Sequence, residues 1–381
     1  MIADNGRAPI VFCLVLALSV LLTAAAAGMA APFPVITLNP GDAYFSLDGR
    51  QSYVLSRNIT GKTREDFDIL LGWARQGGTG LIRVHLTHGF WGDAWISRDF
   101  SVNEQWARNW DRFFDQARAG GIFVLPVFGV WADWNNGKPD YGSPFWQYNP
   151  LNRANGGPVN SPAELFLAGS ETQKRWLAWV KTLVERWRER DNIAAWEIFA
   201  ELNIASGAPG QTDAKGGVDE TAGVDFTNRA MAIFRAADTR RRPVTLSLAG
   251  VYAPSDKWAE YHKQDALDFI ENHPYNDALD RELVREVREY REKYGKPVLI
   301  GESGLWSMTH RPNAPLGIRH AVWAGLVSGA MNGRALWDYD GYAIYSLPGR
   351  ADAMGFMQAY AATELPVANF ARGLDFAASN P

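Results

Sequence analysis

Short apolar runs and amphipathic helical stretches alternate along almost the whole sequence, and this alternation limits the possible folds more than any other feature. Eight runs have the length and composition of buried strands: 53–58, 81–86, 122–128, 194–201, 244–248, 267–273, 298–302 and 335–338. Helical spacing of apolar residues is found between them, over 104–119, 171–190, 221–238 and 278–294. Strands that alternate with helices pair in parallel, so the pattern predicts an α/β fold.

Eight strand-and-helix repeats without a break in composition favour a closed barrel. We therefore predict a single (β/α)8 TIM barrel as a catalytic domain over residues 32–381. An open, doubly wound sheet is the alternative, because it is built from the same units. Such a sheet usually carries a glycine-rich phosphate-binding turn after its first strand, and the stretch 58–61, Asn-Ile-Thr-Gly, is not such a turn.

Residues 1–31 are expected to be a secretion signal peptide. Arg7 precedes an apolar run over 10–22, and a tract of small residues over 24–31 offers cleavage sites. The run is shorter than the roughly 18 apolar residues that a membrane-spanning helix needs. The only cysteine, Cys13, lies inside it, so the mature chain would have no thiol for catalysis, disulfides or metal binding. We expect a secreted or periplasmic protein.

Charge and aromatic content indicate the kind of partner. The net charge is −4 and the only basic cluster is Arg240–Arg242, so we expect no nucleic-acid partner, and no membrane partner once the signal is removed. Six of the 16 tryptophans lie in stretches rich in Gly, Asn and Pro: Trp91, Trp95, Trp131, Trp134, Trp146 and Trp306. A loop indole can stack on the C–H face of a sugar, so this group favours a carbohydrate partner.

Two glutamates end predicted strands. In a barrel, alternate residues of a strand face the lumen, and this count places Glu197, Phe199 and Glu201 on one face of the fourth strand. Glu302 is the last residue of its face on the seventh strand. Both would lie at the C-terminal rim, where barrel enzymes carry their chemistry. Two facing carboxyl groups are the minimum required to cleave a glycosidic bond.

Other strand ends supply supporting side chains. Arg83 on the second strand is a candidate partner for a buried carboxylate. On the sixth strand Glu271, His273 and Tyr275 share one face, and the eighth strand ends at Trp337. Each of these residues alone is more often structural than functional. Their combination with two glutamates is what indicates an active site.

This combination resembles clan A of the glycoside hydrolases, the cellulase-like and mannanase-like (β/α)8 enzymes. Members place an acid/base glutamate at the end of strand four and a nucleophile at the end of strand seven. The resemblance implies that Glu201 is the acid/base and Glu302 the nucleophile of a retaining enzyme. It also implies that Arg83, the stretch 273–275 (His-Pro-Tyr) and Trp337 support the site. The implied substrate is a β-1,4-glucan or a β-mannan, hydrolysed without cofactor or metal. The loop aromatics favour endo-action, of the endo-β-glucanase or β-mannanase type, but the same residues could also build a deep exo-type pocket.

The sequence departs from the clan immediately before the acid/base. An asparagine that bonds the sugar 2-hydroxyl is usual there, whereas this chain has Ala200. That bond strengthens in the transition state, so its loss could cost several kcal/mol. Asn203 is a candidate replacement. The remaining candidate contacts with substrate are His88, Trp131, Trp134 and Trp306.

Two other functions stay open at this point. The missing asparagine is compatible with a non-catalytic or weakly active carbohydrate-binding barrel. His85 and His88, together with nearby acidic residues, suggest a metal-dependent hydrolase on the same barrel. Residues three apart in an extended strand point to opposite faces, which argues against a shared ion unless the chain turns between them.

Overall fold

The computed structural model describes residues 32–59, 63–87, 94–136, 145–213, 215–250, 257–304, 314–333 and 350–378. The chain divides into two compact units, 1–34 and 35–381, and the structure below is that of the second. The predicted signal peptide lies outside the described residues, as does the predicted eighth strand over 335–338. Among the described helices, none combines the length and the apolar character that crossing a membrane requires.

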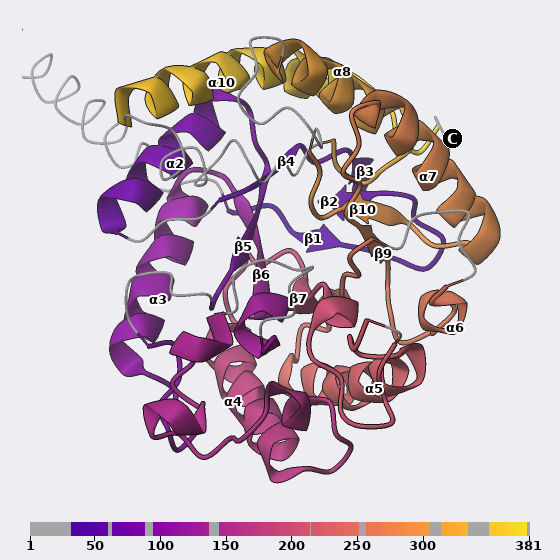
Figure 1. The fold of residues 1–381 in the computed structure, drawn as a ribbon. Helices are drawn as coiled ribbons and strands as arrows, with labels where there is room; N and C mark the ends of the chain where they lie inside the picture. The colour runs from indigo at the N-terminus through magenta and orange to yellow at the C-terminus, as the bar shows by residue number, and fades with distance from the viewer. Residues whose placement is uncertain are drawn as a thin grey trace, which may run out of the picture. The chain divides into compact units, whose positions relative to one another are not determined.

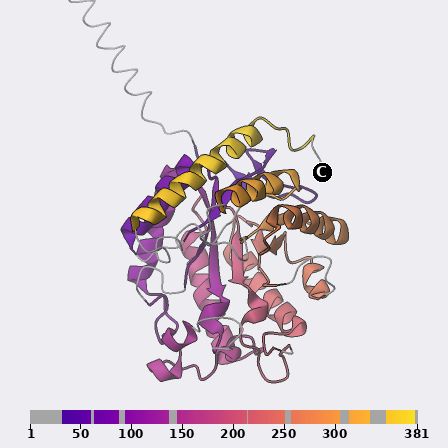
Figure 2. The same ribbon diagram turned by 45° about the horizontal axis from the view of Figure 1, so that its top comes forward.

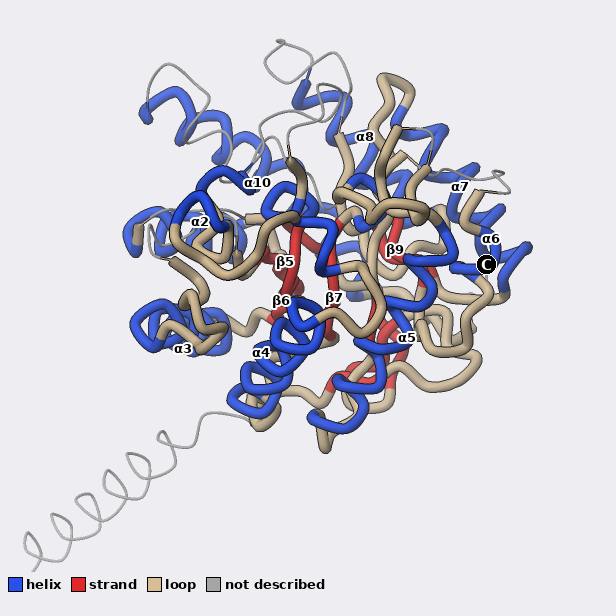
Figure 3. Tube along the Cα trace, turned by 60° about the horizontal axis from the view of Figure 1, so that its bottom comes forward, coloured by secondary structure: helices blue, strands red, loops and turns tan. Residues whose placement is uncertain are grey.

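The prediction of a (β/α)8 barrel is confirmed. Its parallel strands in the described part of the chain are β4 (Ser56–Asn58), β5 (Leu81–His85), β6 (Phe123–Val130), β7 (Trp196–Ala200), β8 (Val244–Thr245), β9 (Ile270–Asn272) and β10 (Val298–Ile300). Strands β4 to β8 form one sheet and β9 and β10 another. A bridge between Ser247 and Glu271 joins the two sheets. In Figures 1 and 3 the strands lie inside a ring of helices.

The segment around Met331 closes the wall between β10 and β4. Its backbone N–H donates to the carbonyl of Val298 at 2.8 Å, and its own carbonyl accepts from Val54 at 3.1 Å. The side-chain amide of Asn332 donates to the carbonyl of Ile300 at 2.7 Å and to the hydroxyl of Ser56 at 2.5 Å. This is the position of the eighth strand in a closed barrel.

The helices are α2 (Arg64–Gln76), α3 (Glu104–Ala119), α4 (Glu171–Trp187), α5 (Glu220–Ala237), α6 (Ala259–His262), α7 (Leu279–Tyr294), α8 (Ala314–Val327) and α10 (Arg350–Arg372). Four of them, α3, α4, α5 and α7, confirm the predicted helical ranges within a few residues. Polar caps fix several starts: Thr63 and Asp66 form a capping box at α2, and Asn103 caps α3.

A small antiparallel sheet, which the sequence analysis did not predict, precedes the barrel. It consists of β1 (Ile36–Thr37), β2 (Phe45–Leu47) and β3 (Arg50–Ser52). Asp48 and Gly49, with φ of 50° and 81°, make the tight turn between β2 and β3. The buried ring of Phe45 lies 6.0 Å from that of Phe269, directly before β9. This sheet therefore lies at the N-terminal end of the strands, away from the predicted site.

Tryptophan fills much of the layer between helices and strands. Buried indoles from α3, α4 and β7 contact one another or neighbouring phenylalanines: Trp106, Trp110, Trp176, Trp179, Trp187 and Trp196. Large aromatic side chains remove much apolar area from water at little loss of rotamer entropy, so this layer makes a rigid support for the ends of β6 and β7.

The last helix is tied to the first barrel strand. Figure 2 shows α10 running beside α8 and α2. On its inner side Glu364 forms an ion pair with Arg57 of β4, and both side chains are fully buried. A buried ion pair is weak evidence for net stability, but removing one partner leaves the other charge in a medium of low dielectric constant.

We predict that Glu364→Gln, which keeps the side-chain shape but removes the negative charge facing Arg57, lowers the free energy of unfolding by about 3–5 kcal/mol. Asp225→Asn is the matched control, because it breaks an ion pair with Arg229 in which the side chains are 43% and 44% exposed. The control should lose about 0.5 kcal/mol or less. Equilibrium unfolding in denaturant measures both, and equal losses would contradict the role given to the buried pair.

Candidate active site

Arg83 of β5 holds three carboxylates in the lumen. Its Nε and Nη2 donate to the two carboxylate oxygens of Glu197 at 2.6 and 2.7 Å, and its Nη1 donates to Glu302 at 2.9 Å. A carboxylate oxygen of Glu271 lies 2.8 Å from Nε. One guanidinium on β5 thus joins side chains carried by β7, β9 and the end of β10. Arginine suits this position because its planar fork pairs with several carboxylates and stays charged when buried.

Glu201 and Glu302, the two predicted catalytic residues, lie together at the C-terminal rim. A carboxylate oxygen of each and a ring nitrogen of His273 lie within 4.8 Å of one another. The side chains of Glu201 and Glu302 are 14% and 8% exposed, whereas those of Glu197 and Glu271 are fully buried. Of the four lumen glutamates, the rim pair is the one that solvent or a ligand can reach.

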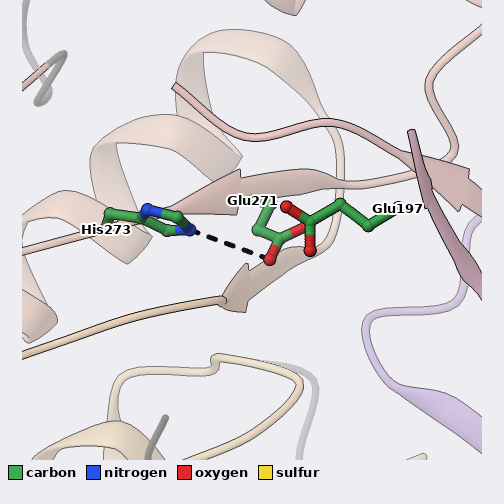
Figure 4. A group of neighbouring side chains, drawn as sticks. All are labelled: Glu197, Glu271 and His273. Atoms are coloured by element: carbon green, nitrogen blue, oxygen red, sulfur yellow. Dashed lines mark ion pairs between the residues drawn. The ribbon is translucent and has the colours of Figure 1, made fainter. Parts of the chain in front are cut away.

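His273 and Tyr275 bridge the two rim glutamates, and the structure brings both into the site. The Nδ1 atom of His273 lies 2.9 Å from Glu201, while its Nε2 atom lies 3.8 Å from Glu271 (Figure 4). The phenol of Tyr275 donates to Glu302 at 2.9 Å. Each rim carboxylate therefore has a fixed neighbour of its own on the segment that follows β9.

The environment separates the pKa values of the two rim carboxyls. Burial raises the pKa of Glu201, and the nearby charge of Glu302 raises it further. Burial also acts to raise the pKa of Glu302, but His273, Arg83 and the hydrogen bond from Tyr275 outweigh it and lower this pKa. A pair in which one carboxyl keeps its proton and the other is ionised is what an acid and a nucleophile need.

The charge on His273 depends on the same carboxylates. Burial acts to lower its pKa, but the charge of Glu302 and the contacts with Glu201 and Glu271 raise it to about 10. These carboxyls therefore favour the imidazolium form of the ring, which donates its Nδ1–H to Glu201. Deeper in the lumen, burial acts to raise the pKa of Glu197, and the charge of Arg83 and its hydrogen bonds oppose this rise.

Glu201 reaches the lumen by a backbone turn rather than by regular strand alternation. The ring of Phe199 packs against Trp176 of α4 and Phe226 of α5, so the prediction that Phe199 shares the lumen face of Glu197 is wrong. Alternation continued from Phe199 would send Glu201 towards the helices as well. Instead Glu201 has φ 58° and ψ 50°, in the left-handed region. Rotation about N–Cα from an extended to a left-handed φ moves the side chain to the opposite side of the chain.

Three of the four described tryptophans of the predicted platform belong to the core. Trp134 is fully buried in the 3-10 helix η2 (Trp131–Trp134) and packs on Trp146, which is also buried. Trp95 is buried against Trp179. These three indoles have no open face for a sugar, which corrects the expectation drawn from their loop-like surroundings. Trp131 is only partly buried and packs against the cluster of Val127, Val130 and Ala200, the last of which directly precedes Glu201.

Asn203, the candidate replacement for the missing asparagine, is engaged elsewhere. Its side-chain amide donates to the carbonyl of Ala249 at 2.6 Å and accepts from the N–H of Ala249 at 2.7 Å. This reciprocal pair joins the loops that follow β7 and β8. The other predicted contacts, His88, Trp306 and Trp337, lie outside the described residues, as does Trp91.

Ser247 lies in a predicted strand but was given no role, and Glu271 was given only a place on the lumen face of its strand. Glu271 was on the same counted face as His273, and its place beside Arg83 follows from that count. Ser247 hydrogen-bonds to both Glu197 and the backbone of Glu201. A serine within an apolar strand was the available signal.

Two groups of side chains have metal-like spacing within the described part of the chain. Glu197, Glu271 and His273 form one, shown in Figure 4, and Glu201, His273 and Glu302 form the other. In the first group the guanidinium of Arg83 already lies within 2.8 Å of both carboxylates, so a second cation would be repelled. In the second the protonated ring of His273 has the same effect. Neither group fits a cation well in this charge state.

No family model and no curated protein matches the sequence. Solved structures do resemble the fold. A β-1,4-D-mannanase from Cryptopygus antarcticus aligns with a TM-score of 0.60 at 14% identity, over 86% of this chain and 94% of that chain. An endo-1,4-β-mannanase from Rhizomucor miehei gives 0.59 at 14% identity, over 84% and 99%. An endogalactoceramidase gives 0.59 at 16% identity, over 86% and 84%. Similarity at these identities shows that this chain shares the (β/α)8 fold of those enzymes.

We predict that Glu302→Gln lowers the pKa of His273, because the charge of Glu302 is the largest influence that raises it. In the unmodified protein the ring should stay doubly protonated at pH 8. Titration followed by ¹⁵N NMR of the imidazole nitrogens measures both, with His273→Gln to assign the signal. Glu260→Gln, on the exposed side of α6, is the control and should leave the pKa unchanged. The same titration curve in Glu302→Gln and the unmodified protein would contradict the coupling.

Proposed function

We propose that this protein is a retaining glycoside hydrolase that cleaves β-glycosidic bonds in a polysaccharide or oligosaccharide, with Glu201 as acid/base and Glu302 as nucleophile. The observation that carries the proposal is the approach of their carboxylate oxygens within 4.8 Å. Retaining enzymes hold their two carboxyl groups about 5–5.5 Å apart, whereas inverting enzymes need roughly 6.5–9.5 Å to admit a water molecule.

In the first step the ionised carboxylate of Glu302 attacks the anomeric carbon. The bond from that carbon to the leaving oxygen breaks, and the proton of Glu201 passes to this oxygen. Arg83 and Tyr275 each donate a hydrogen bond to Glu302 and keep it ionised and oriented. The product of the step is a glycosyl ester on Glu302 with Glu201 as a carboxylate.

In the second step the ester on Glu302 no longer carries a charge. The repulsion that raised the pKa of Glu201 is then absent, so Glu201 stays a carboxylate until it takes a proton from an incoming water. The oxygen of that water attacks the anomeric carbon and releases Glu302. Both glutamates return to their starting protonation states, and the sugar keeps its anomeric configuration.

A β-mannan or β-1,4-glucan is the proposed substrate. Several solved structures with a similar fold are mannanases, and the partly exposed indole of Trp131 suits stacking on a sugar ring. His88, Trp306 and Trp337 remain proposed substrate contacts. Residues 1–31 are proposed to direct the protein to the periplasm or the medium.

A carbohydrate-binding barrel with weak or no turnover is the second candidate. The observation that favours it is Ala200, together with the engagement of Asn203 by Ala249, because the described site then lacks an evident donor for a sugar 2-hydroxyl. Screening purified protein against a panel of polysaccharides, with sizing of the products, separates the two functions. Release of reducing ends that persists in EDTA supports the retaining hydrolase. Binding without release supports the second candidate, and loss of activity in EDTA supports a metal-dependent hydrolase.

We predict that Glu302→Ala abolishes hydrolysis, because no group then forms the glycosyl ester. Glu201→Ala should lose roughly 10²–10⁴-fold in rate, the usual contribution of general acid–base catalysis. Azide should restore turnover in Glu201→Ala on a substrate with a good leaving group, since azide attacks without a general base. Glu260→Ala is the control and should stay fully active. Full activity in either site variant would refute the assigned roles.

A further inference from the structure

Ser247, which follows β8, connects the buried carboxyl of Glu197 to the backbone of Glu201. Its hydroxyl donates to Glu197 at 3.0 Å and accepts from the N–H of Glu201 at 3.1 Å. A hydroxyl has one proton to give, and here it goes to the carboxyl, so the oxygen lone pair is left for the N–H. The residue is fully buried.

The backbone of Ser247 holds the same turn from both sides. Its N–H donates to the carbonyl of Phe199 at 3.1 Å, and its carbonyl accepts from the N–H of Leu202 at 3.2 Å. Three of the four residues from Phe199 to Leu202 are therefore bonded to this one serine. Through Glu197, the turn is also attached to the guanidinium of Arg83.

These hydrogen bonds matter because Glu201 has a backbone conformation that residues other than glycine rarely adopt. A left-handed residue other than glycine costs roughly 1–3 kcal/mol and persists only where its surroundings fix it. A buried N–H without a partner costs about 1–3 kcal/mol. Loss of the Ser247 hydroxyl would leave the N–H of Glu201 unpaired and remove a stabilisation of the same size as the strain. The left-handed φ is what directs the carboxyl to the lumen.

We propose that Ser247 is a positioning residue that directs the carboxyl of Glu201 at the glycosidic oxygen by holding its backbone left-handed. The inference rests on the proposed role of Glu201 and adds a link to it. Arg83 and Glu197, which are paired deep in the lumen, thereby fix the backbone of Glu201 at the rim through the hydroxyl of Ser247. Because Ser247 acts on the backbone of Glu201, its loss should slow proton donation by Glu201 and should leave substrate binding unchanged.

The experiment compares Ser247→Ala with the unmodified enzyme on two β-glycosides of the same sugar. One has a dinitrophenolate leaving group, which departs without a proton, and the other has an alkyl alcohol leaving group, which needs one. Ser247→Ala should lose about 10²-fold in kcat/KM on the alkyl glycoside, the size of effect that a misplacement near 1 Å produces. On the dinitrophenyl glycoside kcat/KM should change little, because this ratio reports only the steps up to formation of the glycosyl ester.

Thr245→Val is the matched control. Thr245 lies two residues earlier, in β8, and is fully buried. Its backbone pairs with that of Glu197, but its hydroxyl donates to the carbonyl of Phe269 at 3.1 Å and to neither Glu197 nor Glu201. It should keep the ratio of the two kcat/KM values found for the unmodified enzyme. Equal losses on both substrates in Ser247→Ala, or the same selective loss in Thr245→Val, would show a general structural role and overturn the proposal.

A crystal structure of Ser247→Ala tests the inference without any activity. The φ of residue 201 should leave the left-handed region, or its carboxyl should move away from His273; an unchanged turn overturns the proposal even if no substrate is hydrolysed. Failure of the proposed function alone would appear as an inactive unmodified protein. If Ser247→Ala does not fold, Ser247→Cys keeps the shape with a weaker donor and acceptor. Ser247→Cys should lose less kcat/KM than Ser247→Ala would, and only on the alkyl glycoside. If Ser247→Cys shows no selective loss on that substrate, the proposal is overturned.

Discussion

The guanidinium of Arg83 is the interaction on which the arrangement of the lumen depends. Three carboxylates from different strands converge within hydrogen-bond distance of it, and in a medium of low dielectric constant they would repel one another strongly without it. Its presence lets Glu302 remain ionised near the rim, and it positions Glu197 below the turn that carries Glu201. The chemistry proposed at the rim is therefore organised from a layer that no substrate reaches.

The fold was predictable because its signals are local. Helix α3 begins and ends at the predicted residues, since Asn103 caps it and its apolar side chains recur at helical spacing. Helix α8 was not specified, because residues 314–327 are apolar on nearly every side and no polar face marks them as a helix rather than a strand. The sheet β1–β3 depends on strands of two or three residues, which are too short for a sequence pattern.

The site was predictable only in part, for reasons that differ between residues. Strand counting placed Glu302 at the rim, where it lies two residues after the end of β10. The same count placed Glu201 at the rim, where it lies, but by a route that the structure contradicts at Phe199, since no pattern of residue types reveals a left-handed φ. The tryptophan prediction failed for Trp134 and Trp146 because burial is decided by tertiary packing, and loop-like neighbours do not report it.

The ion pair between Arg57 and Glu364 has a consequence for the order in which the protein can form during synthesis. Arg57 leaves the ribosome near the start of the chain, whereas its partner follows about three hundred residues later. Until then the first barrel strand carries a cation that the finished interior cannot accept alone. In a chain that still lacks α10, burying the charge of Arg57 inside a closed barrel is therefore unfavourable. Closure of the barrel becomes favourable once Glu364 of α10 is present to pair with Arg57.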